Sequence, residues 1–242
     1  MCIRDSKIRR RSLVYFISAP FGNYIKRSDA VSVTGTWTLQ PRSGRFQQII
    51  KTLRYTRQGW RNKLGLRNPG IWVGLKKTSM REVLSLAAIQ PNDWLSMYQI
   101  IHRIQNLEIN VSCPNLDTHE DTTQFEGFEL FANQKSKWCI VKIPPNATKD
   151  LVDKIVDVGY TQIHASNTLP TDKGGLSGQV LVPYTLELID YIKKTHPHVS
   201  VIAGGGVYAK PDAQRYINAG ADHISLGTVC FTPWKLKRII ND

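Results

Sequence analysis

The sequence lacks any apolar run of about 18 residues, the length that a helix needs to cross a bilayer, so we expect no transmembrane segment. It also has few cysteines: Cys2, Cys113, Cys139 and Cys230 are spread over 242 residues. No two of them have the spacing of zinc ligands, and their scatter does not indicate a disulfide framework. We therefore expect no metal site and a reducing, cytoplasmic setting.

Acidic residues are scarce, with 19 Asp and Glu against 32 Lys and Arg, which gives a formal net charge of +13. Much of the excess lies in residues 7–11 and 51–67. A basic surface attracts nucleic acids, phosphates or small anions, whereas a solvated helix face would need no ligand at all. We expect residues 45–67 to help bind a small anionic ligand rather than a nucleic acid.

The chain shows no linker, internal repeat or low-complexity segment, so we expect one domain over residues 13–242. Its length is close to the roughly 250 residues typical of a TIM barrel, and 41% of its residues are hydrophobic, enough for one large core. The first six residues resemble a string derived from a sequencing adapter. We expect residues 1–12 to be a tail outside the fold and the true N-terminus to be missing.

Short β-rich runs alternate with longer helical stretches, which predicts parallel strands joined by crossovers. Most of the strand runs are continuously apolar, as expected of strands buried on both faces. The expected strands are Leu13–Ala19, Ala30–Thr34, Ile71–Leu75, Leu107–Ser112, Trp138–Ile143, Thr161–Ala165, Val199–Ala203 and His223–Gly227. The expected helices are Arg45–Thr56, Thr78–Gln90, Trp94–Asn106, Thr148–Val158, Pro183–Lys194, Pro211–Ala219 and Pro233–Ile240.

Eight such units favour an α/β fold of the (β/α)₈ TIM-barrel class. A doubly wound open sheet is the alternative, but it calls for a glycine-rich turn after the first strand. In this sequence the glycine-rich turns follow the last strands, at Gly204–Gly206 and Gly227–Thr228. TIM barrels commonly bind phosphate in these loops, because glycine lets backbone N–H groups approach the oxygens. A third segment, Gly174–Gly178, is expected to be a flexible loop that completes the phosphate cup.

Polar residues gather where strands four, five and six end, which is the active-site face of a barrel. Strand four runs into Asn110-Val111-Ser112-Cys113-Pro114-Asn115, where two amides suited to a planar heterocycle flank a thiol. A thiol can transfer protons when its pKa suits the task. Lys142 is a charge within an apolar run, so it needs a partner, and we expect it to face a cofactor. Cys139 and Cys230 are expected to be packed thiols inside strands.

Together with Val141–Pro145 and Ser166–Thr168, these motifs resemble the dihydroorotate dehydrogenase family of FMN-dependent barrels, over nearly the whole chain after residue 13. The resemblance implies oxidation of the CH–CH bond of dihydroorotate to give orotate, in pyrimidine biosynthesis. Cys113 would be the catalytic base that removes the C5 proton, while hydride leaves C6 for flavin N5. Cysteine at this position is typical of the soluble class, and serine of the membrane-associated class.

The resemblance also implies binding residues. Lys142 would stabilise negative charge on the reduced flavin, and the late glycines with Thr228 would hold the phosphate. The implied substrate-binding residues are Asn62, Leu64, Gly65, Leu66, Asn110, Asn115, Asn167 and Thr168. The implied cofactor-binding residues are Ala19, Thr36, Asn110, Lys142, Ser166, Gly178, Gly205, Gly206, Gly227 and Thr228.

One departure concerns a lysine that the family carries after the first or second strand. The corresponding positions here are Asn23 and Gly35, and Lys26 is the nearest residue that could substitute. Two alternatives therefore stay open: another FMN barrel that reduces a pyrimidine base or a tRNA uridine, and a catalytically impaired relative that binds FMN or a phosphorylated ligand. The electron acceptor is undetermined at this stage, and a homodimer is compatible with these features.

Overall fold

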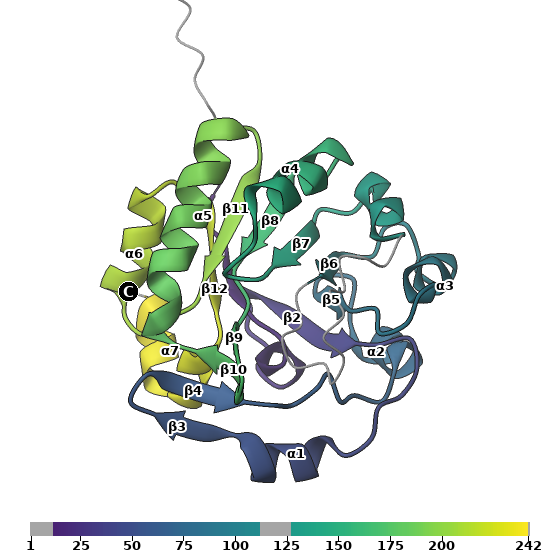
Figure 1. The fold of residues 1–242 in the computed structure, drawn as a ribbon, viewed down its shortest axis with the longest axis horizontal. Helices are drawn as coiled ribbons and strands as arrows, with labels where there is room; N and C mark the ends of the chain where they lie inside the picture. The colour runs from purple at the N-terminus through teal and green to yellow at the C-terminus, as the bar shows by residue number, and fades with distance from the viewer. Residues whose placement is uncertain (1–11, 112–126, 242) are drawn as a thin grey trace, which may run out of the picture.

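A closed barrel of eight parallel strands forms the centre of the molecule (Figure 1). It is seen in a computed structural model that describes residues 12–111 and 127–241. The first strand pairs with both the second and the last, which closes the sheet and confirms the predicted barrel. The barrel strands, in spatial order, are β1 (Tyr15–Ile17), β2 (Ala30–Trp37), β5 (Val83–Leu86), β6 (Leu107–Asn110), β7 (Cys139–Ile143), β8 (Gln162–Ala165), β11 (Ser200–Gly204) and β12 (His223–Leu226).

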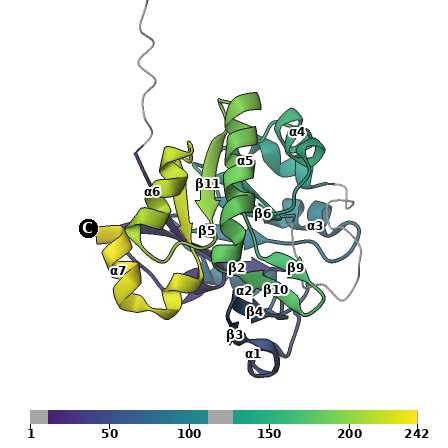
Figure 2. The same cartoon turned by 60° about the vertical axis from the view of Figure 1, so that its left-hand side comes forward.

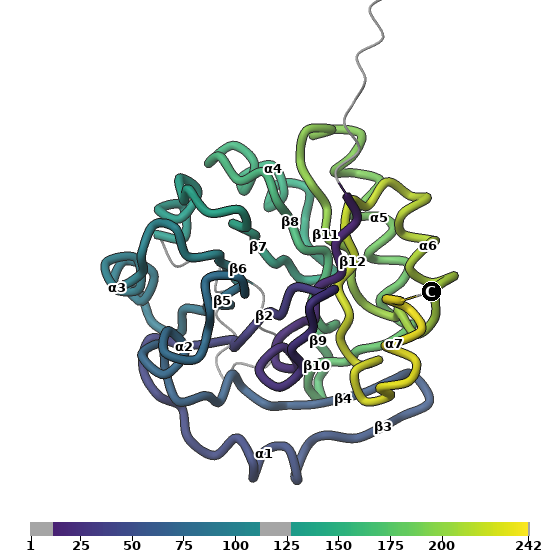
Figure 3. Tube along the Cα trace, turned by 180° about the vertical axis from the view of Figure 1, so that it is seen from behind, coloured from purple at the N-terminus to yellow at the C-terminus, as the bar shows by residue number. Residues whose placement is uncertain are grey.

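Helices surround this barrel on its outer side, as the front and back views show (Figures 1 and 3). None of the helices in the described part of the chain has the length and apolar character to cross a membrane. The α-helices are α1 (Arg45–Thr52), α2 (Ile71–Lys77), α3 (Asp93–Ile100), α4 (Lys149–Asp157), α5 (Val182–Thr195), α6 (Lys210–Asn218) and α7 (Pro233–Asn241). The short 3₁₀ helices are η1 (Phe21–Asn23), η3 (Phe128–Asn133), η4 (Gln179–Leu181) and η5 (Thr228–Phe231).

A second, antiparallel sheet lies apart from the barrel, with strand order β3 (Arg54–Thr56), β4 (Gly59–Asn62), β10 (Gly174–Ser177) and β9 (Leu169–Thr171). This sheet joins the segment that follows β2 to the segment that follows β8. The backbones approach so closely that a Cβ on Gly59 would lie 2.0 Å from the Ser177 carbonyl oxygen. The predicted helix over 45–56 is therefore too long, and the predicted flexible loop at 174–178 is a paired strand as far as Ser177.

The core has two parts that follow from the alternation of side chains along each strand. Outward residues such as Ile17, Leu84 and Val141 belong to a large cluster that the helices cover. Their neighbours Phe16, Val33, Val83, Ile140 and Ile202 form a smaller apolar cluster, with one residue from each of five barrel strands. Two positions further along four of these strands, the inward residues are Ser18, Ser85, Lys142 and Gly204, so the barrel interior becomes polar toward the carboxyl ends of its strands.

The third barrel strand was wrongly predicted. Ile71–Leu75 is not a strand but most of helix α2, and the strand is β5, inside the segment 78–90 that was expected to be helical. Both segments are short apolar runs, which periodicity alone does not distinguish. All four residues of β5 are buried. In α2, Gly74 lets the helix pack on Trp37, since a Cβ there would lie 2.7 Å from the indole.

Candidate active site

Two cavities lie at the carboxyl ends of the barrel strands, one of about 510 Å³ and one of about 140 Å³. The larger is within the range of roughly 300–1,000 Å³ typical of small-molecule sites. The two cavities adjoin, because they share eight lining residues. The shared residues are Ala19, Pro20, Arg45, Asn62, Leu64, Lys142, Asn167 and Thr168.

Backbone groups dominate one end of the larger cavity, after β11 and β12. The Gly205 carbonyl accepts a hydrogen bond from the Tyr216 hydroxyl at 2.6 Å, and the Gly206 carbonyl accepts one from Gln179 Nε2 at 2.7 Å. Because a carbonyl and the following N–H point in opposite directions across a trans peptide plane, the next N–H groups turn away from these side chains. Within the described residues, the N–H groups of Gly206 and Thr228 donate to no partner. This end can therefore bind an anion such as a phosphate.

The glycines at this end are required by geometry. Gly205 and Gly206 have φ angles of +91° and +70°, which residues with a Cβ rarely adopt. A Cβ would lie 2.7 Å from Leu181 at Gly205 and 2.8 Å from Val182 at Gly206. The donor set and the space kept free by these glycines fit the phosphate end of FMN.

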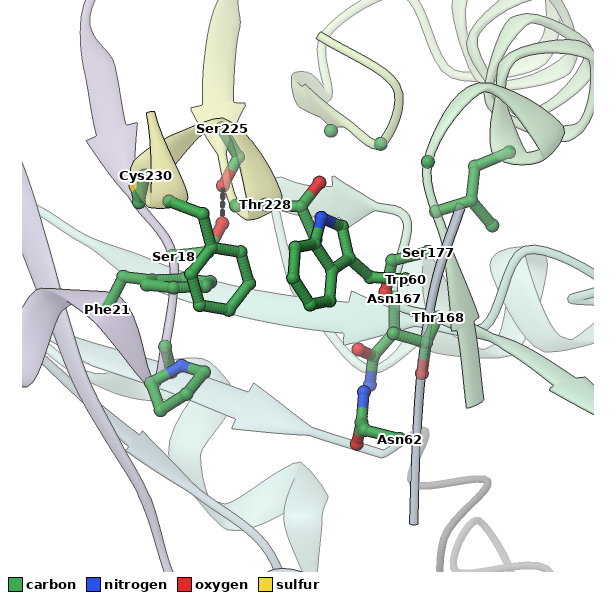
Figure 4. Close-up of a pocket in the computed structure, with 18 of the residues that line it drawn as sticks. Ser18, Phe21, Trp60, Asn62, Asn167, Thr168, Ser177, Ser225, Thr228 and Cys230 are labelled. Atoms are coloured by element: carbon green, nitrogen blue, oxygen red, sulfur yellow. Dashed lines mark hydrogen bonds between the residues drawn. The ribbon is translucent and has the colours of Figure 1, made fainter. Parts of the chain in front are cut away.

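Side-chain amides dominate the smaller cavity. Asn167 Nδ2 donates to Asn110 Oδ1, and Asn110 Nδ2 donates to Thr36 Oγ1, each at 3.4 Å. Figure 4 shows the amides of Asn62 and Asn167 pointing toward one another from β4 and from the end of β8. Amides offer both donors and acceptors, so this set can match the alternating N–H and C=O edge of a planar pyrimidine.

The loop after β4 lies at the same cavity, as predicted. Leu64, Gly65 and Leu66 line it, and Leu66 has a φ angle of +52°, which is uncommon for a residue with a side chain. Asn68 Nδ2 donates to the Leu66 carbonyl at 2.6 Å, and Arg42 Nε donates to the Gly65 carbonyl at 3.2 Å. These bonds hold the loop against the cavity.

Two arginines of the basic segment 45–67 reach the cavities. Arg45 lines both of them and lies over the Tyr24 ring, 5.7 Å from its centre. Arg67 lines the smaller one and donates to the Ser43 carbonyl at 2.8 Å, while its buried Nε has no hydrogen-bond partner in the described structure. Positive charge from this segment is thus available at both cavities. Lys51, Arg54 and Arg57 do not line either cavity.

An ionisable network lies directly beneath both cavities, and it was not predicted. Glu108 accepts a hydrogen bond from Ser85 Oγ at 2.8 Å and contacts His164 Nδ1 at 2.7 Å. Lys142 Nζ lies 3.9 Å from the same carboxylate. All three residues are buried: Glu108, Lys142 and His164 are 1%, 5% and 2% exposed. The Glu108 carboxylate is thus a partner for the Lys142 charge, as the sequence required.

The charge states of this network follow from its contacts. Burial opposes ionisation of Glu108, but the charge of Lys142 and the hydrogen bond from His164 outweigh it and lower the pKa to about 2. Burial lowers the pKa of His164 against the opposing pull of Glu108, so the imidazole is neutral at pH 7. A carboxylate only accepts hydrogen bonds, so Nδ1 carries the proton and Nε2 is left as an acceptor at the larger cavity.

The positions where the family lysine was sought lie together. Asn23 Nδ2 donates to the Gly35 carbonyl, and the Gly35 N–H donates to Asn23 Oδ1, both at 2.9 Å. Both residues line the smaller cavity. Lys26 does not substitute: it forms an ion pair with Glu82, at the start of β5 and away from the strand ends that form the site. The hypothesis about Lys26 is wrong.

Cys113 and Asn115 lie outside the described residues. The described cysteines behave largely as predicted: burial raises the pKa of both Cys139 and Cys230 to about 12, so both stay protonated. Cys230, however, lies in η5 rather than in a strand, and it lines the larger cavity.

All the remaining predicted site residues line one cavity or both. Sequence reasoning missed Glu108 and His164, although Glu108 carries the same signal as Lys142, a charge within an apolar strand. It also missed an aromatic row at the larger cavity, where Trp60 and Phe231 have ring centres 4.4 Å apart. Figure 4 labels Trp60 and Phe21 at this cavity. The residues that line only the smaller cavity include Thr36, Gly65, Leu66 and Asn110; those that line only the larger include Ser166, Gly178, Gly205, Gly206, Gly227 and Thr228.

Comparison with known proteins identifies the family of this chain. A family model described as dihydroorotate dehydrogenase matches residues 21–242. The catalytic subunit of dihydroorotate dehydrogenase B (NAD(+)) from Thermotoga petrophila is 29% identical, covering 88% of this chain and 88% of that protein. Dihydroorotate dehydrogenase A (fumarate) from Lactiplantibacillus plantarum is 23% identical, covering 80% of this chain and 73% of that protein.

Solved structures agree in fold. The crystal structure of DHODH from Eimeria tenella in complex with ferulenol has a TM-score of 0.68 at 19% identity, covering 94% of this chain and 79% of that one. The family match spans most of the chain, including every described strand end that lines the two cavities except that of β1. The chain belongs to the dihydroorotate dehydrogenase family.

Proposed function

We propose that this chain is an FMN-dependent enzyme that oxidises dihydroorotate to orotate, a step of pyrimidine biosynthesis. One observation carries the proposal: a large cavity with a glycine-lined anion end opens beside a small cavity lined by amides, and the two share Lys142 and Asn167. A flavin ring and a planar substrate can therefore lie in contact. A cytoplasmic location is part of the same proposal.

The residues of the larger cavity would hold FMN, which when bound would accept the hydride released from the substrate. Gly178, Gly205, Gly206, Gly227 and Thr228 would bind its phosphate through backbone N–H groups and the Thr228 hydroxyl. Ala19, Lys142 and Ser166 would surround the ring system from the larger cavity, together with Thr36 and Asn110 from the adjoining smaller one. Lys142 is positioned to attract negative charge, since it lines both cavities and its Nζ lies 3.9 Å from Glu108 beneath them.

The residues of the smaller cavity would bind the substrate. Asn62, Asn110, Asn167 and Thr168 would match the pyrimidine edge, together with Asn115, and the backbone of Leu64, Gly65 and Leu66 would contact its carboxylate. Arg45 and Arg67 supply positive charge near that carboxylate. Selective recognition follows because a bound analogue that lacks a hydrogen-bonding group would cover these amides without pairing them.

Cys113 would be the base that removes the C5 proton. It follows Asn110, the last residue of β6, by three positions in the sequence, and this proximity along the chain supports the proposal. The names of two relatives give different electron acceptors, NAD(+) in one and fumarate in the other. We therefore propose no acceptor for the reduced cofactor of this chain.

The test is stopped-flow reduction of bound FMN by dihydroorotate under anaerobic conditions. Cys113→Ala should keep FMN but be reduced about 10²- to 10⁴-fold more slowly, the usual contribution of general acid–base catalysis. Cys113→Ser should retain partial activity with its pH optimum moved upward, because a hydroxyl is a far weaker acid than a thiol. Reduction of Cys113→Ala at the wild-type rate would mean that Cys113 is only a packed thiol.

A second candidate is an impaired relative that binds FMN without turning over dihydroorotate. It is favoured by Asn23 and Gly35, which hydrogen-bond each other where the family would place a lysine. The same experiment separates the two: wild-type protein that holds FMN and binds orotate, but is never reduced by dihydroorotate, supports the second candidate.

A further inference from the structure

One segment carries nearly all of the protein's net charge. From Ala30 to Arg81 there is no Asp or Glu, while Lys and Arg occur 11 times. The rest of the chain almost balances, with 21 basic and 19 acidic residues. Within the described structure, none of these 11 cations forms a salt bridge with a carboxylate. The active site uses Arg45 and Arg67, so most of this charge has no role in the proposed reaction.

The same segment exposes large apolar side chains. Helix α1 has no buried residue: Ile49 lines the larger cavity, as does Leu53 directly after the helix, whereas Phe46 and Ile50 are 74% and 59% exposed. Phe46 and Ile50 are four positions apart, so they lie on one face of the helix. Tyr55 on β3 is 73% exposed. In Figures 1 and 2, α1 and the β3–β4 hairpin form a projecting edge of the molecule.

The hairpin also has the charge pattern of an anion-binding surface. Arg54 and Arg61 are directly opposite each other across β3 and β4. Like charges at opposed positions destabilise a sheet, and a bound anion would relieve this repulsion. Arg54 Nη1 donates to the Ile50 and Leu53 carbonyls at 2.9 and 2.8 Å, which holds its charge beside the end of α1. Lys51 and Arg57 are exposed at either side of this pair.

We propose that α1 and the β3–β4 hairpin dock on an anionic phospholipid surface. Phe46, Ile50 and Tyr55 enter the headgroup boundary, while Lys51, Arg54 and Arg57 bind anionic headgroups. Exposed apolar residues beside cations are the composition of segments that lie in a membrane interface. A second copy of this chain does not fit, because two such surfaces repel each other. A nucleic acid would use the cations and the rings but not the aliphatic Ile50.

The test is cosedimentation of the full chain with phosphatidylcholine vesicles, prepared with and without phosphatidylglycerol. Binding should require phosphatidylglycerol and weaken as salt rises. Lys51→Glu/Arg57→Glu should weaken it at least about 25-fold, since each basic residue near such a surface contributes about fivefold and the reversed charges add repulsion. Phe46→Ser/Ile50→Ser should weaken it about tenfold.

Matched controls are exposed residues outside this edge. Lys135→Glu/Lys210→Glu removes equal charge elsewhere, and Ile104→Ser, 53% exposed in the wild type, removes an apolar side chain between α3 and β6. Both should bind vesicles within about twofold of wild type. Thermal melts verify that every variant folds. No binding to either vesicle type, equal binding to both, or unchanged binding of both edge variants would overturn the proposal. Because no turnover is measured, this outcome is independent of the proposed enzyme activity.

Discussion

At the ends of β11 and β12 the cavity lining is largely glycines and backbone N–H groups, whereas at the ends of β6, β7 and β8 it consists of side chains that face one or both cavities. Backbone donors carry no titratable proton and have no rotamers to lose, so they suit a permanently bound phosphate. Asn110, Lys142 and Asn167 can instead match the pattern of a particular substrate. The side-chain part of the site depends on buried contacts beneath it, because the Glu108 carboxylate contacts both Lys142 and His164.

The largest expected effect concerns this support. Glu108→Gln leaves the buried Lys142 charge without its carboxylate, and removing one partner of a buried ion pair typically costs about 3–5 kcal/mol. We expect the free energy of unfolding, measured in urea, to fall by that amount. The control is Glu82→Gln, which breaks a half-exposed pair with Lys26 and should cost under about 1 kcal/mol. Equal costs for the two variants would mean that the network does not stabilise the barrel.

The pH dependence sharpens the same point. The folded pKa of Glu108 is about 2, below its ordinary value of 4.5, so its contribution to stability is complete above pH 4.5 and is lost as pH falls toward 2. The lowered pKa of His164 acts in the same direction from pH 6.5 downward. Wild-type stability should therefore fall continuously from pH 6.5 to acid. Glu108→Gln should have a shallower slope below pH 4.5, which pH-jump urea melts can measure.

A smaller effect is expected in the backbone-lined half. Gly206→Ala places a Cβ 2.8 Å from Val182 at a φ angle of +70°, which should displace the N–H groups of the anion site and weaken FMN binding about 10²-fold. Gly44→Ala is matched in backbone strain, with φ +86°, but its Cβ meets nothing closer than 3.6 Å. It should keep full flavin affinity in a fluorescence titration. If both variants lose FMN equally, strain alone explains the loss.

The smallest effect is expected for the substrate half. Asn62→Ala removes one amide that points toward Asn167 and should weaken orotate binding to the FMN-loaded chain about tenfold, the scale of one hydrogen bond in a buried site. Flavin affinity should change less than twofold. The orotate-induced shift of the flavin spectrum reports both quantities, and a loss of FMN without loss of orotate affinity would reverse the assignment of the two cavities.

Much of this site was predictable from sequence because its parts follow strands at fixed ends. Gly204–Gly206, Gly227–Thr228 and Asn110 come directly after apolar runs, and all of them lie at the cavities. Barrel closure brings such strand ends together whatever their separation in the chain. Lys142 was identified by the same reasoning, as a charge that an apolar strand tolerates only with a partner.

Other parts were unpredictable for physical reasons. Val83–Leu86 and Ile71–Leu75 are both short apolar runs, and only packing decided which became the strand. His164 looked like an ordinary strand residue until β8 was placed two strands from β6, with its imidazole on Glu108. The sheet of β3, β4, β10 and β9 joins segments more than 100 residues apart, so no local sequence pattern predicts it.

The most direct test of the account is anaerobic titration of the FMN-loaded chain with dihydroorotate, followed by the flavin absorbance and by analysis of the product. If the glycine-lined cavity holds FMN and the amide-lined cavity holds the substrate against it, the flavin will bleach in proportion to added dihydroorotate and an equal amount of orotate will appear. A chain that binds FMN tightly but keeps it oxidised at saturating dihydroorotate would contradict the account.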